Sequence, residues 1–261
     1  MVDGESRSGQ LRTVDRALVV LSAFTDERPE RGVVELAREL GLDKSQVQRM
    51  LATLAGRGFL TVRPDTRRYR LGPALLGLGR RAERSMGLDG SISTVLHTLA
   101  HTFAHSAVFN VPDGSQYRCA AAVDFPGPIR YSSAIGELYP GHGGASGHAI
   151  FAQLPTERVR ELFPGRLAAL TRSTIGTVDA LLHRHAQVRD RGVAISEGEY
   201  HPQVMAVAAP VFVAGGVVGS IGIAGAAEQM RERVDEITTA VVAAAAELTS
   251  RYRPDGSVRT P

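Results

Sequence analysis

The glycine-rich segment 141–147, Gly-His-Gly-Gly-Ala-Ser-Gly, is the part of this sequence best suited to hold a small ligand. Its pattern predicts a loop that enters a helix. Free backbone N–H groups at such a junction can bind a carboxylate, with help from the helix dipole. Ser146 adds a hydroxyl, and Tyr131 is expected along the side of the ligand. We therefore expect a small organic acid with an apolar or aromatic body to anchor at Ser146; a tight glycine turn without a ligand is the alternative.

Three histidines recur at four-residue intervals and would share one face of a helix: His97, His101 and His105. Paired histidines at this spacing can chelate a metal ion. However, the segment lacks the glutamate of an HExxH motif, and Leu99 and Phe103 give it the pattern of a core helix. We therefore predict no metal site.

No group of residues predicts catalysis. Ser146 is followed at once by Gly147, so the GxSxG pattern of a nucleophile elbow is absent. The glycines at 216, 219, 222 and 225 lie in a predicted hairpin rather than a strand-to-helix turn, so they are no dinucleotide fingerprint. We predict neither enzyme activity nor a cofactor.

Polar side chains also cluster in a segment with the spacing of a helix-turn-helix. Gly41 stands where the first helix must end, in a left-handed turn, and Asp43 is in an N-cap position before the second. The apolar positions that would hold the two helices together are Leu36, Leu40, Leu42, Val47 and Met50. The polar residues expected to face DNA are Lys44, Ser45, Gln46, Gln48 and Arg49. Glutamine and arginine can each form paired hydrogen bonds with a base edge in the major groove.

A basic hairpin is predicted after these helices. Residues 59–63 and 67–71 are β-prone and flank a Pro-Asp-Thr turn. Arg67, Arg68 and Tyr69 are expected to contact the phosphate backbone from this wing, although a purely structural hairpin is the alternative. With the helix predicted from Thr13 to before Pro29, the pattern is that of a winged helix-turn-helix.

Composition indicates a globular protein with two domains. The chain has 261 residues, 43% of them hydrophobic, and a net charge of +3. Basic residues outnumber acidic ones in residues 1–87, and the opposite holds in residues 88–261. No apolar run is long enough to span a membrane and no signal peptide is recognisable, so we expect a cytoplasmic protein. The single cysteine, Cys119, excludes an intramolecular disulfide and is expected to be buried.

We predict five segments: a disordered tail (1–10), the winged helix-turn-helix (11–73), a linker helix (74–90), a second domain (91–253) and a tail (254–261). Within the second domain, helices are expected at about 91–105, 145–153, 155–163, 178–191 and 229–252. Strands are expected at 107–111, 116–123, 129–134, 204–212 and 217–223. Hairpins flanked by helices make an α+β domain.

The chain resembles the IclR family of bacterial transcriptional regulators from about Leu11 to Tyr252. The motifs that carry the resemblance are TVDRALVVLSAF, VVELARELGLDKSQVQRMLATLAGRGFL, RYRLGPALLGLG, YPGHGGASGHAI, RGVAISEGEY and VAAPVFVAGGVVGSIGIAG. The resemblance implies a GAF-like effector-binding domain after the winged helix. It also implies dimers formed through the DNA-binding domains and commonly paired into tetramers.

By the same resemblance, a small-molecule pocket is bordered by Tyr131, Gly144, Ala145, Ser146, Ser196, Glu199, Gly222 and Ala224. Several relatives carry an aspartate where this chain has Ser196, and hydroxyl side chains where it has Gly222 and Ala224. These departures predict a larger pocket with a less polar wall on that side.

We therefore expect a sequence-specific DNA-binding regulator, a repressor, whose operator binding is controlled by a small organic acid. A symmetric dimer would bind double-stranded DNA with inverted half-sites. Three alternatives remain: an activator of the same family, an enzyme joined to a DNA-binding domain, and an architectural protein that binds DNA without sequence preference.

Overall fold

The computed structural model describes residues 11–25, 27–85, 90–125 and 135–251. It divides into two compact units, with the division between Ser85 and Met86. The two predicted tails lie outside the described residues, as does the strand expected at 129–134. No helix among the described residues is both long and apolar enough to cross a membrane.

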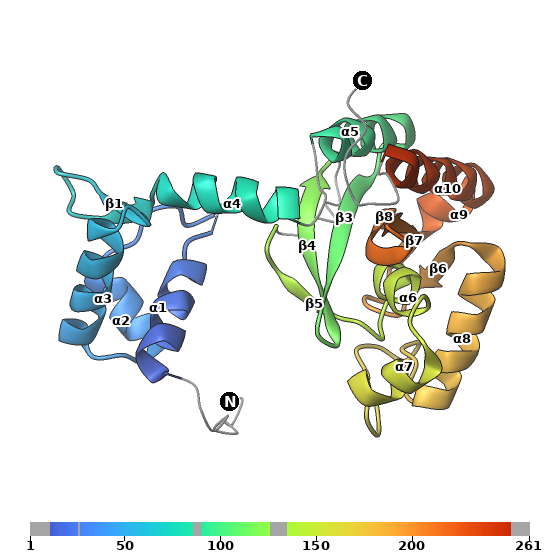
Figure 1. Cartoon of the computed structure of the whole chain (residues 1–261), viewed down its shortest axis with the longest axis horizontal. Coiled ribbons are helices and arrows are strands. Elements are labelled where there is room, and N and C mark those ends of the chain that lie inside the picture. The colour runs from blue at the N-terminus through green and yellow to red at the C-terminus, as the bar shows by residue number, and fades with distance from the viewer. Residues whose placement is uncertain (1–10, 26, 86–89, 126–134, 252–261) are drawn as a thin grey trace. The chain divides into compact units, whose positions relative to one another are not determined.

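The first unit is a winged helix-turn-helix, as predicted (Figure 1). Its elements are α1 (Arg12–Ser22), α2 (Val33–Leu40), α3 (Lys44–Gly56), β1 (Leu60–Val62), β2 (Tyr69–Leu71) and α4 (Ala74–Ser85). Gly41 ends α2 with a φ of 63°, the left-handed region that favours glycine. The Oδ1 atom of Asp43 accepts hydrogen bonds from the backbone N–H groups of Ser45 (2.8 Å) and Gln46 (3.2 Å), which caps α3.

A buried arginine fastens the wing to the helices. Arg31 is 1% exposed, and its guanidinium donates to the carbonyl of Ala23 at 2.8 Å and pairs with Glu35 at 2.7 Å and with Glu39. Its backbone N–H and C=O bond to the C=O and N–H of Tyr69 at 2.9 and 2.8 Å. A buried charge is tolerated only when it is paired and hydrogen-bonded in this way, so Arg31 fixes the position of β2.

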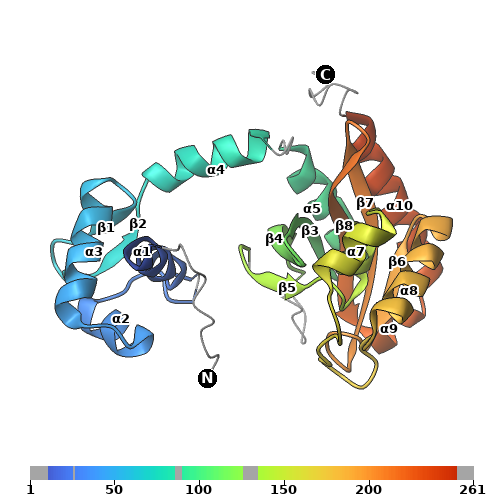
Figure 2. The same ribbon diagram turned by 60° about the horizontal axis from the view of Figure 1, so that its bottom comes forward.

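The second unit is one antiparallel sheet with helices on both faces (Figures 1 and 2). Its strands are β3 (Ser106–Asp113), β4 (Gln116–Val123), β5 (Leu138–Pro140), β6 (Ala194–Glu197), β7 (Val204–Val213) and β8 (Gly216–Ala226). Its helices are α5 (Ser91–Phe103), α6 (Ala145–Phe151), α7 (Thr156–Leu162), α8 (Val178–Arg191), α9 (Ala227–Arg231) and α10 (Val234–Arg251). Among the described residues the strand order is β5-β4-β3-β8-β7-β6, and every neighbouring pair is antiparallel.

Alternate residues of the strands point to opposite faces of the sheet, and the two faces carry side chains of different size. The odd-numbered positions of β7 and β8, such as Val207 and Ile223, join the main core beneath α5 and α10. The even-numbered positions opposite α6, such as Ala206, Ala208 and Gly222, are small, and Ala208 packs with Ala145 and Ala149 of α6. Period-two alternation in a strand produces this division, and the small side chains allow α6 to approach the sheet closely.

Two glycines allow close backbone approaches, Gly147 at the start of α6 and Gly222 between β8 and β7. A Cβ atom on Gly147 would lie 2.3 Å from the carbonyl oxygen of Gly141, and one on Gly222 would lie 2.5 Å from the carbonyl oxygen of Val207. Real Cβ atoms do not approach backbone atoms this closely. The pattern that looked like a ligand-binding loop is therefore also a packing requirement.

The strands and the last helix of the second unit differ in part from the predictions. Strands β5 and β6 were not predicted, because each has only three or four residues, too few for a recognisable alternation. The last helix is not continuous from 229 to 252, since α9 ends at Arg231 and α10 begins at Val234. Cys119 is buried as expected, and burial raises the pKa of its thiol to about 12.

We expect Gly147→Ala to lower the free energy of unfolding by about 1–3 kcal/mol, because the added methyl group must displace the backbone of Gly141. Gly176→Ala is the matched control, since a Cβ there meets nothing within 4 Å. Urea unfolding of both variants tests this. Equal stability of the two would show that α6 can shift without cost.

Candidate DNA-binding surface and effector pocket

The recognition helix α3 presents the exposed polar side chains Lys44, Ser45 and Arg49, of which Ser45 donates its hydroxyl to Oδ1 of Asp43 at 2.5 Å. The other two predicted contacts are engaged within the unit. Gln46 accepts a hydrogen bond from Nη1 of Arg16 at 3.0 Å, and Gln48 donates from Nε2 to the hydroxyl of Tyr69 at 3.3 Å. Of the predicted base-reading side chains, Arg49 is thus the one that reaches solvent without such a bond to its own unit.

The structure corrects the role expected for Tyr69. Its side chain is 6% exposed and packs in the core with Leu36, Val47 and Leu60. The hydroxyl of Tyr69 accepts a hydrogen bond from the exposed side chain of Gln48. Tyr69 therefore orients a side chain of the recognition helix rather than contacting a phosphate from the wing. Tyr69 was grouped with Arg67 and Arg68 because the three are adjacent in the sequence, whereas along a strand neighbouring side chains point to different faces.

The two wing arginines differ in their surroundings. Arg67 is exposed at the hairpin tip, with a φ of 54°. Arg68 is half-buried, pairs with Glu35 at 2.8 Å and donates to the carbonyl of Glu30 at 2.8 Å. Arg67 can therefore reach a phosphate without breaking an ion pair, whereas Arg68 cannot.

A pocket of about 290 Å³ lies on the α6 face of the sheet in the second unit. Its described lining consists of Val108, Asn110, Tyr117, Glu137, Tyr139, Gly144, Ala145, Ser146, Ser196, Tyr200, Val204, Ala206 and Ala224. These residues come from all six described strands or their ends, from the start of α6 and from the segment after β6.

Five of the residues predicted for the pocket are in this lining: Gly144, Ala145, Ser146, Ser196 and Ala224. Gly222 shares their face of the sheet but lies against Ala208, beneath α6 rather than in the lining. Glu199 lies behind the lining and holds it in place. Tyr131 lies outside the described residues.

The loop before α6 is less free to bind an anion than the sequence predicted. The N–H of Gly144 already donates to Oε2 of Glu199 at 3.3 Å, and the N–H of Ala145 donates to the hydroxyl of Ser196 at 2.9 Å. Deeper in the pocket, Nδ2 of Asn110 donates to the hydroxyl of Ser146 at 2.9 Å. The Oδ1 atom of this buried amide has no partner among the described residues, so one polar atom at the floor remains available.

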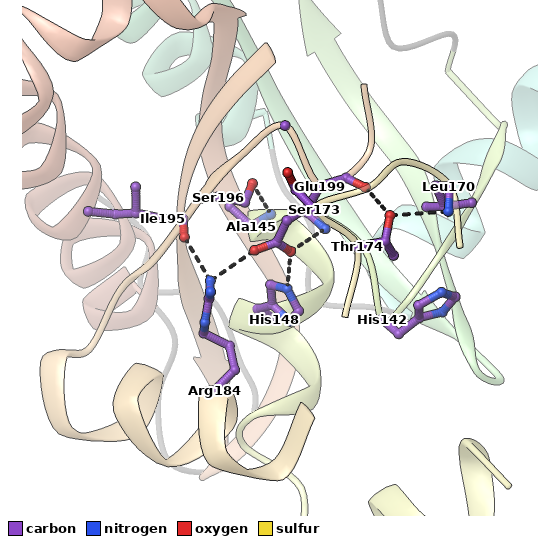
Figure 3. A network of polar contacts seen from close by, with 12 residues as sticks. His142, Ala145, His148, Leu170, Ser173, Thr174, Arg184, Ile195, Ser196 and Glu199 are labelled. Atoms are coloured by element: carbon purple, nitrogen blue, oxygen red, sulfur yellow. Dashed lines mark hydrogen bonds and ion pairs between the residues drawn. The ribbon is translucent and has the colours of Figure 1, made fainter. Parts of the chain in front are cut away.

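Glu199 is the centre of a buried network behind the pocket (Figure 3). It is 4% exposed, and its carboxylate accepts from Nε2 of His148 at 2.6 Å and from Nη1 of Arg184 at 2.9 Å, besides Gly144. Burial opposes ionisation of this carboxyl, yet the hydrogen bond and charge of His148, the charge of Arg184 and the N–H of Gly144 hold the pKa of Glu199 below its usual value. The carboxylate therefore stays ionised and ties α6 to α8.

The backbone around Glu199 is held from the opposite side. The hydroxyl of Thr174 donates to the carbonyl of Glu199 at 2.6 Å (Figure 3). The hydroxyl of Thr171 donates to the carbonyl of Gly198 at 2.5 Å. The loop that carries these threonines is itself fixed where Nε2 of His142 meets the carbonyl of Ala168 at 2.8 Å.

Three tyrosines form an aromatic wall that the sequence did not reveal. The rings of Tyr117 and Tyr139 stack with centroids 5.4 Å apart, and the ring of Tyr200 meets Tyr139 edge-on at 5.6 Å. Tyr139 lies on β5 and Tyr200 follows β6, the two edge strands of the sheet. Their contact shows that the sheet curls over the pocket. No local pattern could predict it, because these edges are far apart in the sequence.

The histidines of α5 show no metal site. The rings of His97 and His101 stack with centroids 6.1 Å apart on the exposed side of the helix. In the part of the chain that the structure describes, no three or more His, Cys, Asp or Glu side chains are placed to hold a metal ion.

Two family models match the chain, in the order that the two units occupy. The model of the bacterial transcriptional regulator IclR C-terminal domain matches residues 82–251, and the IclR helix-turn-helix model matches residues 13–64. The chain belongs to the IclR family. As a member of this family of transcriptional regulators it binds DNA through its helix-turn-helix and is not an enzyme.

Named relatives cover nearly the whole chain. The HTH-type transcriptional regulator BhcR of Paracoccus denitrificans is 28% identical over 96% of this chain and 91% of its own. The transcriptional repressor IclR of Escherichia coli is 26% identical over 94% of this chain and 91% of its own. The crystal structure of an IclR regulator from Alicyclobacillus acidocaldarius superposes with a TM-score of 0.76 at 26% identity, covering 92% of this chain and 98% of that one.

The same fold occurs with a ligand in a more distant structure. An IclR homologue from Microbacterium hydrocarbonoxydans, complexed with 4-hydroxybenzoate, has a TM-score of 0.76 at 16% identity, over 91% of this chain and 98% of that one. At this identity the comparison concerns the fold alone.

A second histidine lies beneath the Glu199 network. His185 of α8 is fully buried, its ring centroid is 5.9 Å from that of His148, and neither of its ring nitrogens has a hydrogen-bond partner among the described residues. Burial, followed by the charges of His148, Arg189 and Arg184, lowers the pKa of His185 to about 3. The ring is therefore neutral in the folded protein.

This lowered pKa predicts a loss of stability in mild acid. Between about pH 6.5 and pH 3 the unfolded chain protonates His185 and the folded chain does not, so the free energy of unfolding falls as pH falls, by up to about 1.4 kcal/mol per pH unit. His185→Leu removes this contribution and also removes two unpaired polar atoms. We expect its stability to match or exceed that of the wild type at pH 7.5 and to decline less by pH 5.

Urea unfolding at both pH values measures the difference. His183→Leu, on the exposed side of the same helix, is the control and should decline as the wild type does. Parallel pH curves for the wild type and His185→Leu would contradict a neutral buried ring.

Proposed function

We propose that the protein is a transcriptional repressor whose operator binding is controlled by a small organic acid bound in the second unit. The observation that carries this proposal is the 290 Å³ pocket at the start of α6, in a chain whose other unit is a winged helix-turn-helix. Activation by the same chain is the second candidate. Because its target is the chromosome, the regulator is placed in the cytoplasm.

The acid is proposed to lie with its carboxylate at the floor of the pocket. Ser146 and Ser196 are 8% and 6% exposed there, and both present hydroxyl groups that can donate. The free Oδ1 of Asn110 can accept from a donor group of the ligand rather than from its carboxylate, and the tyrosine wall fits an aromatic body. That a homologue binds 4-hydroxybenzoate supports this size and chemistry of ligand.

Self-association is proposed through the first unit. Exposed apolar side chains recur along α1 at Val14 and Leu18, and along α4 at Leu76 and Leu78. Large apolar side chains grouped on exposed helices commonly mark protein–protein contacts. A symmetric dimer, which can pair again into a tetramer, would place two recognition helices on inverted half-sites of double-stranded DNA.

Base recognition is proposed for Arg49, together with Lys44, Ser45, Gln46 and Gln48 of the same helix. Arg67 and Arg68 of the wing are proposed to contact phosphates. Arg68 does so only if its pair with Glu35 opens.

Arg49→Ala should weaken binding to an operator selected from genomic DNA by about tenfold to a hundredfold, because a bidentate contact with guanine discriminates by about 1–3 kcal/mol. Binding to unrelated DNA should change much less. Arg67→Ala is the comparison and should weaken both by a similar factor, with a smaller dependence on salt. Titrations at two salt concentrations measure both. An equal loss on both sequences for Arg49→Ala would make it a phosphate contact.

Ser146→Trp should abolish the response to effector while leaving operator binding intact, because the indole would fill the pocket floor. Ser250→Trp, at an exposed position on α10 and outside the described lining, is the control. Thermal shift with a panel of organic acids, followed by operator release, provides the measurement. An unchanged response in Ser146→Trp would place the effector elsewhere.

A further inference from the structure

The mouth of the pocket carries an acidic group surrounded by aromatic rings. Among the described lining residues, Glu137 is the one with a charged side chain. It immediately precedes β5, and Tyr117, Tyr139 and Tyr200 line the pocket with it. No part of the proposed function uses this carboxylate.

One hydrogen bond positions the carboxylate of Glu137 and leaves part of its capacity to accept hydrogen bonds unused. The hydroxyl of Tyr139 donates to Oε2 of Glu137 at 3.0 Å. An ionised carboxylate offers about four lone-pair sites, so this bond leaves room for donors from a ligand. Tyr139 belongs to an edge strand and also meets Tyr200, which keeps the acidic group beside the mouth.

The negative charge of Glu137 affects the neighbouring Tyr200 at the mouth of the pocket. The pKa of the Tyr200 hydroxyl is raised, first by burial and then by the negative charge of Glu137. The faces of the tyrosine rings are themselves negative, so they add to this field. The mouth therefore favours a positive or hydrogen-donating group and opposes a second carboxylate.

We propose that Glu137 is a specificity-determining residue: the effector presents a hydrogen-bond donor to it, from a protonated amine or a hydroxyl, at the end opposite its carboxylate. This inference rests on the proposed effector site and narrows the ligand class to amino- or hydroxy-substituted acids. Unsubstituted acids and diacids of the same size are disfavoured, because they leave Glu137 unpaired or place a like charge beside it.

Three probes that differ at a single group test the inference: 4-(aminomethyl)benzoate, 4-(hydroxymethyl)benzoate and 4-methylbenzoate. Titration calorimetry of the full chain measures their affinities for the wild type, Glu137→Leu, Glu137→Gln and the control Glu232→Leu, an exposed acidic position outside the described lining. We expect one or both donor-bearing probes to bind the wild type and the control at least about threefold more tightly than the methyl probe, as one net hydrogen bond allows.

Glu137→Leu should abolish this preference. Glu137→Gln separates the two kinds of donor, since it should weaken the amine probe and leave the hydroxyl probe nearly unchanged. A methyl probe that binds the wild type as tightly as the others, a preference that survives in Glu137→Leu, or a failure of all three probes to bind would each overturn the inference. The proposed function is judged separately by operator binding and by the Ser146→Trp variant, so the two can fail independently.

Discussion

The pocket proposed to hold the effector depends on one buried carboxylate. Glu199 receives hydrogen bonds from Gly144, His148 and Arg184, which lie just before α6, on α6 and on α8. An ionised group this deep is stable only while its donors remain, and removal of one partner of a buried pair typically costs about 3–5 kcal/mol. The network therefore holds the start of α6, the segment after β6 and α8 in one arrangement, and the first two of these border the pocket. Because its donors come from separate elements, a change in any of them reaches the pocket.

The packing of α6 explains why the pocket has its depth. Glycine and alanine beneath the helix let it lie close to the sheet, while the pocket opens where α6 begins and the sheet curls. The glycine-rich motif thus has two physical causes. Gly147 is required by contact with the backbone of Gly141, and Gly144 adopts a φ of 88° at the N-cap. The ligand-binding interpretation of this motif was incomplete because backbone contacts account for part of it.

Features that depend on residues close together in the sequence could be predicted from it. The left-handed turn at Gly41 and the cap at Asp43 could be identified because each depends on residues a few positions away. The family resemblance supplied most of the pocket's floor. By contrast, the burial of Tyr69, the role of Glu199 and the meeting of Tyr139 with Tyr200 depend on partners brought together only by the sheet or by helix packing. Short edge strands such as β5 carry too few residues for a recognisable alternation, so the mouth could not be predicted.

A ligand can alter a protein only by interacting differently with two of its states. The floor of this pocket is a poor place for such a difference, since its N–H groups and hydroxyls are already bonded to Glu199, Ser196 and Asn110. The mouth is better suited, because its two sides come from opposite edges of the sheet, where the rings of Tyr139 and Tyr200 meet. Contacts between a ligand and the floor contribute to its binding affinity. A ligand that also contacts both sides of the mouth can stabilise one curvature of the sheet relative to another. We therefore expect the proposed effector to be long enough to reach both the floor and the mouth.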